Sequence, residues 1–364
     1  MSDVLWSYGL FLAEALTVVL AVLVLVAGLA LGRRRLRRTP QLVVTKVNDR
    51  YDAMARAIRA GLVPRRTFRR ELRAERKATR ARNKAESKAG GTTGDEAEGR
   101  AGDEARGTTG GRAGDEPDRR PRVFVLDFLG DLRASRAAAL REEITALLTV
   151  ATPRDEVLVR LENYGGRVHD QGFAASQLLR VRERGIPLTV AVDRVAASGG
   201  YLMACVADRI LAAPFAAVGS IGVIWEQPNV HRFLDRHGVD VEQFKGGEHK
   251  RTVTLLGRTT DEDRERLAEE IRDTHELFKE FVARHRPQVD IARVATGQYW
   301  YGTRALELDL VDELTTSDDY LLARREVADL LEISFPVRTP PLRRLAGLVS
   351  ALGGSALGGS ALGG

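Results

Sequence analysis

The sequence predicts an α/β fold, and three observations support that prediction. Short apolar runs alternate with segments of helical periodicity from residue 121 onward, which is typical of βαβ units and a mostly parallel sheet. Two Gly-rich turns, Gly165-Gly166 and Gly199-Gly200, each follow an apolar run, and ligands of parallel α/β sheets bind at the carboxyl ends of strands. A long helix is predicted from Asp261, with Thr260 as N-cap and Asp263 in the capping-box position.

The predicted elements fill residues 121–335, which we expect to form the folded domain. Leu140, Ile144 and Leu147 fall on one helical face, and Pro287 ends the long helix. Strands are predicted at 123–128, 157–161, 186–192 and from 209 in the run R-I-L-A-A-P, and helices at 135–148, 171–182, 202–207 and 261–284.

The N-terminal region predicts one transmembrane helix. Residues 9–31, after a flank at 1–8, are almost wholly apolar, with Glu14 the only charge, and can cross a hydrocarbon core of about 30 Å. The flank carries Asp3 but no Lys or Arg, which favours a retained span over a cleaved signal peptide. The run R-R-R-L-R-R from Arg33 predicts that the C-terminal side faces the cytoplasm.

Three further segments have compositions that differ from the folded domain. Residues 32–89 form a basic juxtamembrane segment, helical in part, whose Arg and Lys side chains we expect near anionic lipid headgroups. Residues 90–120 repeat R-A-G-D-E and G-T-T-G and contain no apolar side chain larger than Ala apart from Pro117, so we predict a disordered linker. Residues 336–364 end in S-A-L-G-G three times and are predicted to be a low-complexity tail.

Composition excludes several classes of site. The formal net charge is +6, but the basic residues concentrate before residue 83 without interleaved aromatic side chains, so we expect no nucleic-acid partner. Cys205 is the only cysteine, so an internal disulfide is excluded. We predict that Cys205 is a small core residue. No metal-binding spacing is present, and we predict neither a metal nor a cofactor.

A candidate nucleophile lies in the segment V-A-A-S-G-G-Y, residues 195–201. Ser198 stands between two Ala and two Gly on a predicted strand-to-helix turn. Its hydroxyl would be free of bulky neighbours, and the next backbone N–H groups would open a helix, which favours developing negative charge. Small residues at a turn are also common without any chemistry, so the motif needs a base to support it.

Two residue types can activate a serine hydroxyl. Among the histidines, His169 follows the Gly165-Gly166 turn and is the best placed, and His249 lies next to Lys250. The alternative is a neutral Lys, because burial disfavours the ammonium form and lets the amine act as a base. After residue 90 only three lysines remain, Lys245, Lys250 and Lys279, in a region where Arg supplies nearly all the positive charge.

Three long motifs resemble a known family. They are V-D-R-V-A-A-S-G-G-Y-L-M-A-C-V-A-D-R-I-L-A-A-P-F-A-A-V-G-S-I-G-V, H-K-R-T-V-T-L-L-G-R-T-T and V-A-T-G-Q-Y-W-Y-G. Together they resemble the S49 peptidases, the signal peptide peptidase A group, and within it an inner-membrane branch whose apolar N-terminus is also similar. The resemblance covers the apolar segment and residues 123–317.

The resemblance implies a Clp protease/crotonase-like fold and a Ser–Lys dyad. Ser198 would be the nucleophile, Lys250 the general base and Ser220 the hydroxyl that orients the Lys amine. The N–H groups of Gly166 and Gly199 would form the oxyanion hole. The family's S-P-G-G turn reads N-Y-G-G here, and the Tyr that precedes the base is replaced by a His.

The resulting hypothesis is a membrane-anchored serine endopeptidase that cleaves membrane-associated peptides or signal-peptide remnants. Its expected partners are a peptide substrate, membrane lipid through the N-terminal helix, and further copies of the chain. The arginines favour a cytoplasmic catalytic domain, whereas the family favours the periplasmic side of the inner membrane. The alternatives are a catalytically silent membrane scaffold and a crotonase-type acyl-CoA enzyme, which shares the oxyanion turn but needs no nucleophilic serine.

Overall fold

The computed structural model describes residues 42–64, 119–244, 246–247 and 253–336, together with positions 17, 66–68, 70, 73–74, 77 and 81. One compact unit comprises Val44–Ser334, and the remainder, Met1–Val43 and Phe335–Gly364, lies almost entirely outside the described residues. The predicted transmembrane helix falls outside them apart from Thr17, as do almost all of the linker and the tail. In the part that is described, no helix has both the length and the apolar composition to cross a membrane.

The centre of the compact unit is a seven-stranded sheet, which confirms the α/β prediction. Its strand order is β1-β10-β2-β3-β4-β6-β9, and the strands from β10 to β9 pair in parallel. Their bounds are β1 Val43–Lys46, β2 Arg122–Leu129, β3 Glu156–Glu162, β4 Leu188–Val192, β6 Arg209–Ala212, β9 Glu313–Leu314 and β10 Asp329–Ser334.

A second, three-stranded sheet was not predicted. It has the order β5-β7-β8 and consists of β5 Val195–Ala197, β7 Ala217–Gly219 and β8 Tyr299–Tyr301. β5 and β7 are parallel, whereas β7 and β8 are antiparallel. The strand arrangement is therefore mixed, and the small sheet brings together two segments that the sequence analysis singles out, those before Ser198 and before Ser220.

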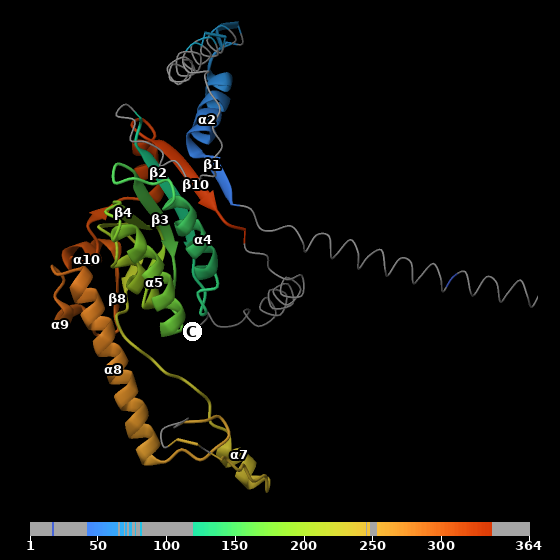
Figure 1. Ribbon diagram of the computed structural model, residues 1–364, viewed down its shortest axis with the longest axis vertical. Coiled ribbons are helices and arrows are strands. Elements are labelled where there is room, and N and C mark those ends of the chain that lie inside the picture. Colours follow the sequence, from blue (N-terminus) through green and yellow to red (C-terminus); the bar gives the residue numbers. More distant parts are fainter. Residues whose placement is uncertain are drawn as a thin grey trace, which may run out of the picture. The chain divides into compact units, whose positions relative to one another are not determined.

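Helices cover both faces of the large sheet. α4 (Ala137–Leu147) and α5 (Val168–Arg182) lie side by side (Figure 1). α2 (Val47–Leu62) and α11 (Ser317–Arg324) contribute to a core with alternate residues of β2, such as Val123 and Val125. The intervening β2 residues Phe124, Leu126 and Phe128 are also buried, as expected for a strand enclosed on both faces.

β1 and the first turns of α2 are bound to the edge of the sheet. The backbone N–H of Leu330 donates to Asn48 Oδ1 at 2.7 Å, and Asn48 Nδ2 donates to the carbonyl of Ala328 at 3.1 Å. Val47 is buried and Tyr51 packs against the same core. The sequence predicts a partial helix in this basic segment but no strand, because the four exposed residues of β1 give no recognisable alternation.

The entry into β2 is fixed by one buried carboxylate. Asp155 is 1% exposed and accepts hydrogen bonds from Arg119, Arg122 and Thr152. Burial acts to raise the pKa of Asp155, but the hydrogen bonds from Arg122 and Thr152 outweigh it and hold the pKa well below its usual range. The start of the domain is thus attached to the turn before β3.

The remaining helices lie after β4. α6 (Gly199–Ala204) follows Ser198, and the C-terminal half of α8 (Asp261–His285) packs near it, with Phe278 and Val282 buried. The predicted capping box of Thr260 and Asp263 is confirmed. α8 extends away from the sheet toward α7 (Figure 1). The others are short: α7 His231–Arg236, α9 Ile291–Val294 and α10 Gly302–Glu307.

Candidate active site

Ser198 occupies a sharp turn between β5 and α6. Its φ and ψ are 53° and −120°, a region that non-glycine residues rarely adopt and that is enriched at functional sites. The conformation is held by hydrogen bonds from its N–H to the carbonyl of Gly219, 2.8 Å, and to its carbonyl from the N–H of Leu202, 3.0 Å. Ser198 therefore lies at the tip of a strained strand-to-helix turn, as the serine of a nucleophile elbow does.

The Gly165-Gly166 turn lies directly against the Ser198 turn. A Cβ on Gly165 (φ 90°) would lie 2.8 Å from Ser198 Cβ and 3.0 Å from the Gly199 nitrogen. A Cβ on Gly166 would lie 2.3 Å from the carbonyl oxygen of Leu132. Only glycine allows such approaches, so the two Gly-rich turns expected at strand ends do meet in space.

Two buried amides between these turns were missed by sequence reasoning. Asn163 and Gln171 are both 0% exposed. Asn163 Oδ1 accepts from the N–H of Gly165 at 2.9 Å, and its Nδ2 donates to Gln171 Oε1 at 2.8 Å. The available signal was a polar residue at the end of a buried strand, at the first position of N-Y-G-G.

Ser220 lies one strand away from Ser198. β5 and β7 pair Ala197 with Gly219, so Ser198 and Ser220 are the next residues on adjacent strands. Ser220 also has a positive φ, 51°, and its Oγ donates to the carbonyl of Gly297 at 3.2 Å. The structure therefore brings Ser198, Gly166, Gly199 and Ser220 into one region.

Of the candidate bases, the structure describes His169 but not the lysines of the loop before α8. Lys245, Lys250 and His249 lie outside the described residues. The His169 side chain is 78% exposed, with Asp170 as an ion-pair partner at 3.7 Å, so it belongs to the solvent-facing side of α5. Cys205 is fully buried, and burial raises the pKa of its thiol, which confirms the predicted core role.

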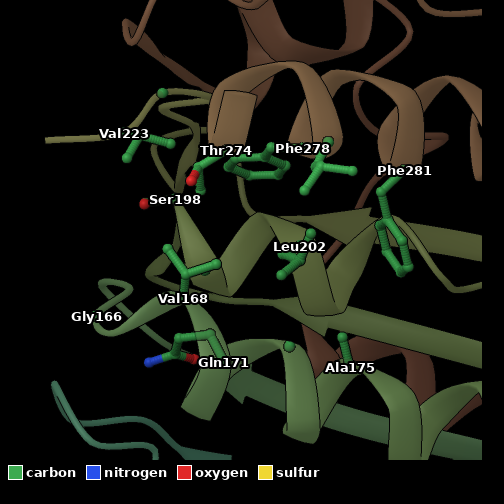
Figure 2. A pocket seen from close by; sticks show the side chains of 14 residues that line it. Gly166, Val168, Gln171, Ala175, Ser198, Leu202, Val223, Thr274, Phe278 and Phe281 are labelled. Atoms are coloured by element: carbon green, nitrogen blue, oxygen red, sulfur yellow. The ribbon is translucent and has the colours of Figure 1, made fainter. Parts of the chain in front are cut away.

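An apolar pocket of about 190 Å³ begins at Ser198. Figure 2 shows Ser198 and Gly166 at one end, and Ala175 and Phe281 at the other. The walls come from α5, α6, α8 and the segment after Ser220. They are Gly166, Val168, Gln171, Gly172, Ala175, Ser198, Gly199, Leu202, Gly222, Val223, Thr274, Leu277, Phe278 and Phe281.

The pocket is smaller than typical sites for drug-sized ligands, which are about 300–1,000 Å³. It has room for a side chain, and its lining side chains are mostly apolar, with Gln171, Ser198 and Thr274 as the polar exceptions. Within the described ranges, no cluster of three or more His, Cys, Asp or Glu side chains could bind a metal ion. The arrangement thus presents one hydroxyl and two backbone turns to the mouth of an apolar pocket.

The wall formed by α8 is fixed at its C-terminal end. Arg286 is 2% exposed and makes two hydrogen bonds of 2.8 Å to the Asp312 carboxylate. Burial acts to lower the pKa of Arg286, but the Asp312 carboxylate outweighs it and the pKa is raised. Tyr201 of α6 donates to the carbonyl of Leu310 at 3.0 Å. Both walls of the pocket are therefore attached to the segment that leads into β9.

Comparison with known proteins identifies the family. The profile described as peptidase family S49 N-terminal matches residues 3–178, and the peptidase family S49 profile matches residues 180–331. A probable protease SohB of Haemophilus influenzae is 42% identical over 348 residues, which are 94% of this chain and 92% of that protein. A probable protease SohB of Buchnera aphidicola is 48% identical over 233 residues, 64% of this chain and 69% of that protein.

A solved structure of a membrane-bound stomatin-specific protease with a substrate peptide overlaps with a TM-score of 0.40 at 12% identity, covering 64% of this chain and 99% of that one. The family assignment rests on the two profiles and on the Haemophilus influenzae relative, which is matched over nearly its full length. On that basis the chain belongs to peptidase family S49.

Proposed function

We propose that the chain is a membrane-anchored serine peptidase in which Ser198 is the nucleophile and Lys250 the general base. The observation that supports this most directly is the strained turn of Ser198 at the mouth of an apolar pocket, against the Gly165-Gly166 turn. The fold would then be the Clp protease/crotonase-like fold expected of the family.

In the proposed reaction, the neutral amine of Lys250 takes the proton of Ser198 Oγ as the oxygen bonds to the peptide carbonyl carbon. The N–H groups of Gly166 and Gly199 stabilise the oxyanion. Lys250 returns the proton to the leaving amine as the C–N bond breaks. Water then attacks the ester, Lys250 takes its proton, and Ser198 Oγ is reprotonated as the acid leaves.

Ser220 fits the role of a hydroxyl that orients the lysine. Its proton is directed at the carbonyl of Gly297, so its lone pairs remain to accept a hydrogen bond from the Lys250 amine. A lysine that donates to Ser220 keeps its own lone pair available for the Ser198 proton.

The pocket supports a preference for apolar side chains next to the cleaved bond. Val168, Leu202, Leu277 and Phe278 offer no hydrogen-bonding side chain, and burying a charged group there would cost several kcal/mol. We therefore expect substrates such as membrane-associated peptides, with an apolar residue beside the scissile bond.

The membrane part of the proposal rests on residues 9–31 and on α2. Val47 and Tyr51 face the core, and the same helical face continues outward through Met54, Ile58 and Leu62, which are 47%, 64% and 77% exposed. Arg59 in the last turn of α2 and the described positions 66, 70, 73 and 77 after it are exposed Arg or Lys residues.

An apolar stripe flanked by basic side chains is complementary to an anionic lipid surface. The surface area of these three side chains falls well short of the roughly 800 Å² that each partner buries in a stable protein interface. We therefore propose an anionic bilayer as the contact of this stripe.

Self-association is proposed for the segment before α8. Its exposed apolar side chains include Ile224 and Phe244, each 91% exposed, with Phe233, Leu255 and Leu256 nearby in the chain. Exposed apolar side chains on this scale mark interaction surfaces, and the family resemblance makes a second copy the expected partner. Phe244→Asp should lower the mass in analytical ultracentrifugation.

The test uses the full chain in detergent with a fluorogenic peptide that has Leu before the cleaved bond. Ser198→Ala should abolish cleavage, and Lys250→Arg should nearly abolish it, because Arg cannot lose its proton at neutral pH. Ser176→Ala is the matched control, since Ser176 is an exposed serine of α5 that donates to the carbonyl of Phe173.

A fluorophosphonate separates this proposal from the alternatives. It should attach to Ser198 in the unaltered chain and to neither the Ser198→Ala nor the denatured protein. Full cleavage by Ser198→Ala would refute the proposal. An unlabelled, inactive but folded protein would instead favour a scaffold or an acyl-CoA enzyme.

A further inference from the structure

We infer that Asn163 and Gln171 act as one buried amide pair that holds the two oxyanion turns in their relative position. This inference rests on the proposed serine-peptidase mechanism and names two positioning residues for it. Neither side chain needs to touch the reacting atoms, because the pair acts through Gly166 and Gly199.

The hydrogen bonds form one directional chain. The N–H of Gly165 donates to Asn163 Oδ1 at 2.9 Å, Asn163 Nδ2 donates to Gln171 Oε1 at 2.8 Å, and Gln171 Nε2 donates to the carbonyl of Asp131 at 3.1 Å. Its two ends are backbone groups whose roles as donor and acceptor are fixed, so both amide orientations are determined. A carboxylate at either position would break one link.

The same side chains fill the space that the glycines leave open. A Cβ on Gly199 would lie 2.4 Å from Gln171 Cγ, and a Cβ on Gly130 would lie 2.3 Å from Asn163 Oδ1. Gln171 therefore packs directly beneath the Gly199 backbone. Asn163 holds the other turn through the Gly165 N–H. The pair therefore contacts both turns that carry a proposed oxyanion donor, the Gly166 turn and the Gly199 turn.

A third segment joins the network at the Gly166 side. The carbonyl of Asp131 accepts from Gln171, and the neighbouring carbonyl of Leu132 accepts from the N–H of Arg167 at 2.9 Å. The same Leu132 carbonyl limits the space at Gly166. The loop after β2 is thus connected to the pair and to the turn at once.

Burial makes the pair sensitive to any change. Both side chains are 0% exposed, so a lost partner leaves a polar group without water to replace it. The remaining donor of Asn163 already faces Met203 Sδ at 3.4 Å, a weak acceptor. Without Gln171, no equally good partner is at hand, and the turn that contains Gly166 loses its support.

The decisive variant is Gln171→Met, which keeps length and packing against Gly199 but removes both hydrogen bonds. We expect kcat for the Leu peptide to fall about 10- to 100-fold, because misplacing oxyanion donors by a fraction of an ångström weakens transition-state binding. KM should change less than about 3-fold for peptides with Leu or Ala before the cleaved bond. Fluorophosphonate labelling should slow by the same factor as kcat.

Gln177→Met is the matched control. Gln177 is a glutamine of the same helix, 7% exposed, and its amide bonds stay within α5. It should lose stability without a selective loss of kcat. Asn163→Ser is the second variant, and the double variant with Gln171→Met should be no slower than the slower single one if the pair acts as a unit.

The outcomes separate the two proposals. If Ser198→Ala abolishes cleavage but folded Gln171→Met keeps kcat within 2-fold, the positioning role is refuted and the mechanism stands. Equal losses of kcat in Gln177→Met, or multiplying losses in the double variant, also refute it. Full cleavage by Ser198→Ala refutes the mechanism, and with it the reason for the pair. If Gln171→Met does not fold, Asn163→Ser decides by the same criteria.

Discussion

Gly200→Ala is a small change with a large predicted effect on catalysis. Gly200 is the second residue of α6, and a Cβ there would lie 2.2 Å from the carbonyl oxygen of Asn163. That oxygen belongs to backbone, which accepts the N–H of Ala197 at 3.0 Å. The methyl group therefore cannot be accommodated by rotating a side chain.

The size of the effect follows from the missing space. Ordinary contact begins at 3.4 Å, so α6 and the Asn163 strand end must separate by roughly 1.2 Å in total. A misplacement of about 1 Å in an active site can lower the rate about 100-fold, which corresponds to about 2.7 kcal/mol of activation free energy. Overpacking of this kind costs about 1–3 kcal/mol of stability as well.

The assay measures kcat/KM with the fluorogenic Leu peptide at a temperature where urea titration shows that the variant is folded. Gly61→Ala is the control, because its Cβ would meet nothing within 4 Å in exposed α2, and Ala favours a helix by up to about 1 kcal/mol. If folded Gly200→Ala kept more than half of the activity, the Ser198 turn would not be held by this backbone contact.

The other predictions concern the pocket, the domain edge and the lipid surface. Gly172→Leu projects a side chain into the pocket, where the glycine has open space, and should shift the preference from Leu to Ala before the cleaved bond, read as the ratio of kcat/KM values. Asp155→Asn should lower the free energy of unfolding by about 1–3 kcal/mol at neutral pH. The folded pKa of Asp155 lies below the unfolded value of 3.8, so its contribution is complete above that pH and is lost as the pH falls below it; a pH-independent difference in urea titrations would contradict this. Ile58→Cys carrying an environment-sensitive fluorophore should shift to shorter wavelength in phosphatidylglycerol nanodiscs but not in phosphatidylcholine, whereas Ala60→Cys on the opposite face should not; equal spectra for the two would refute lipid contact.

Four strands of the large sheet, β2, β3, β4 and β6, were predictable because they are continuous apolar runs, whereas β1, β9 and β10 were not predicted. The prediction of 123–128 and 157–161 differs from β2 and β3 by one or two residues, and the long helix begins at its predicted cap. The small sheet was not predictable, because β5, β7 and β8 have three residues each. Strands this short have no periodicity, and only pairing between distant segments defines them.

The candidate site divides in the same way. Ser198, Gly166 and Gly199 were found because small residues in a turn after a strand are a local signal. Gln171 was not found, since its importance depends on contacts with residues 8 and 40 positions away. No pattern in a single sequence reports such a pairing.

The position of β1 changes what the long low-complexity region can do. The chain enters the sheet at β1 and α2, leaves it, and returns at Arg119 and β2, with β10 between β1 and β2. Residues 65–118 are therefore an insertion whose two ends return to one edge of the same domain. Lengthening or cutting the insertion should change the stability of the domain only slightly, because the free energy of loop closure grows slowly with loop length.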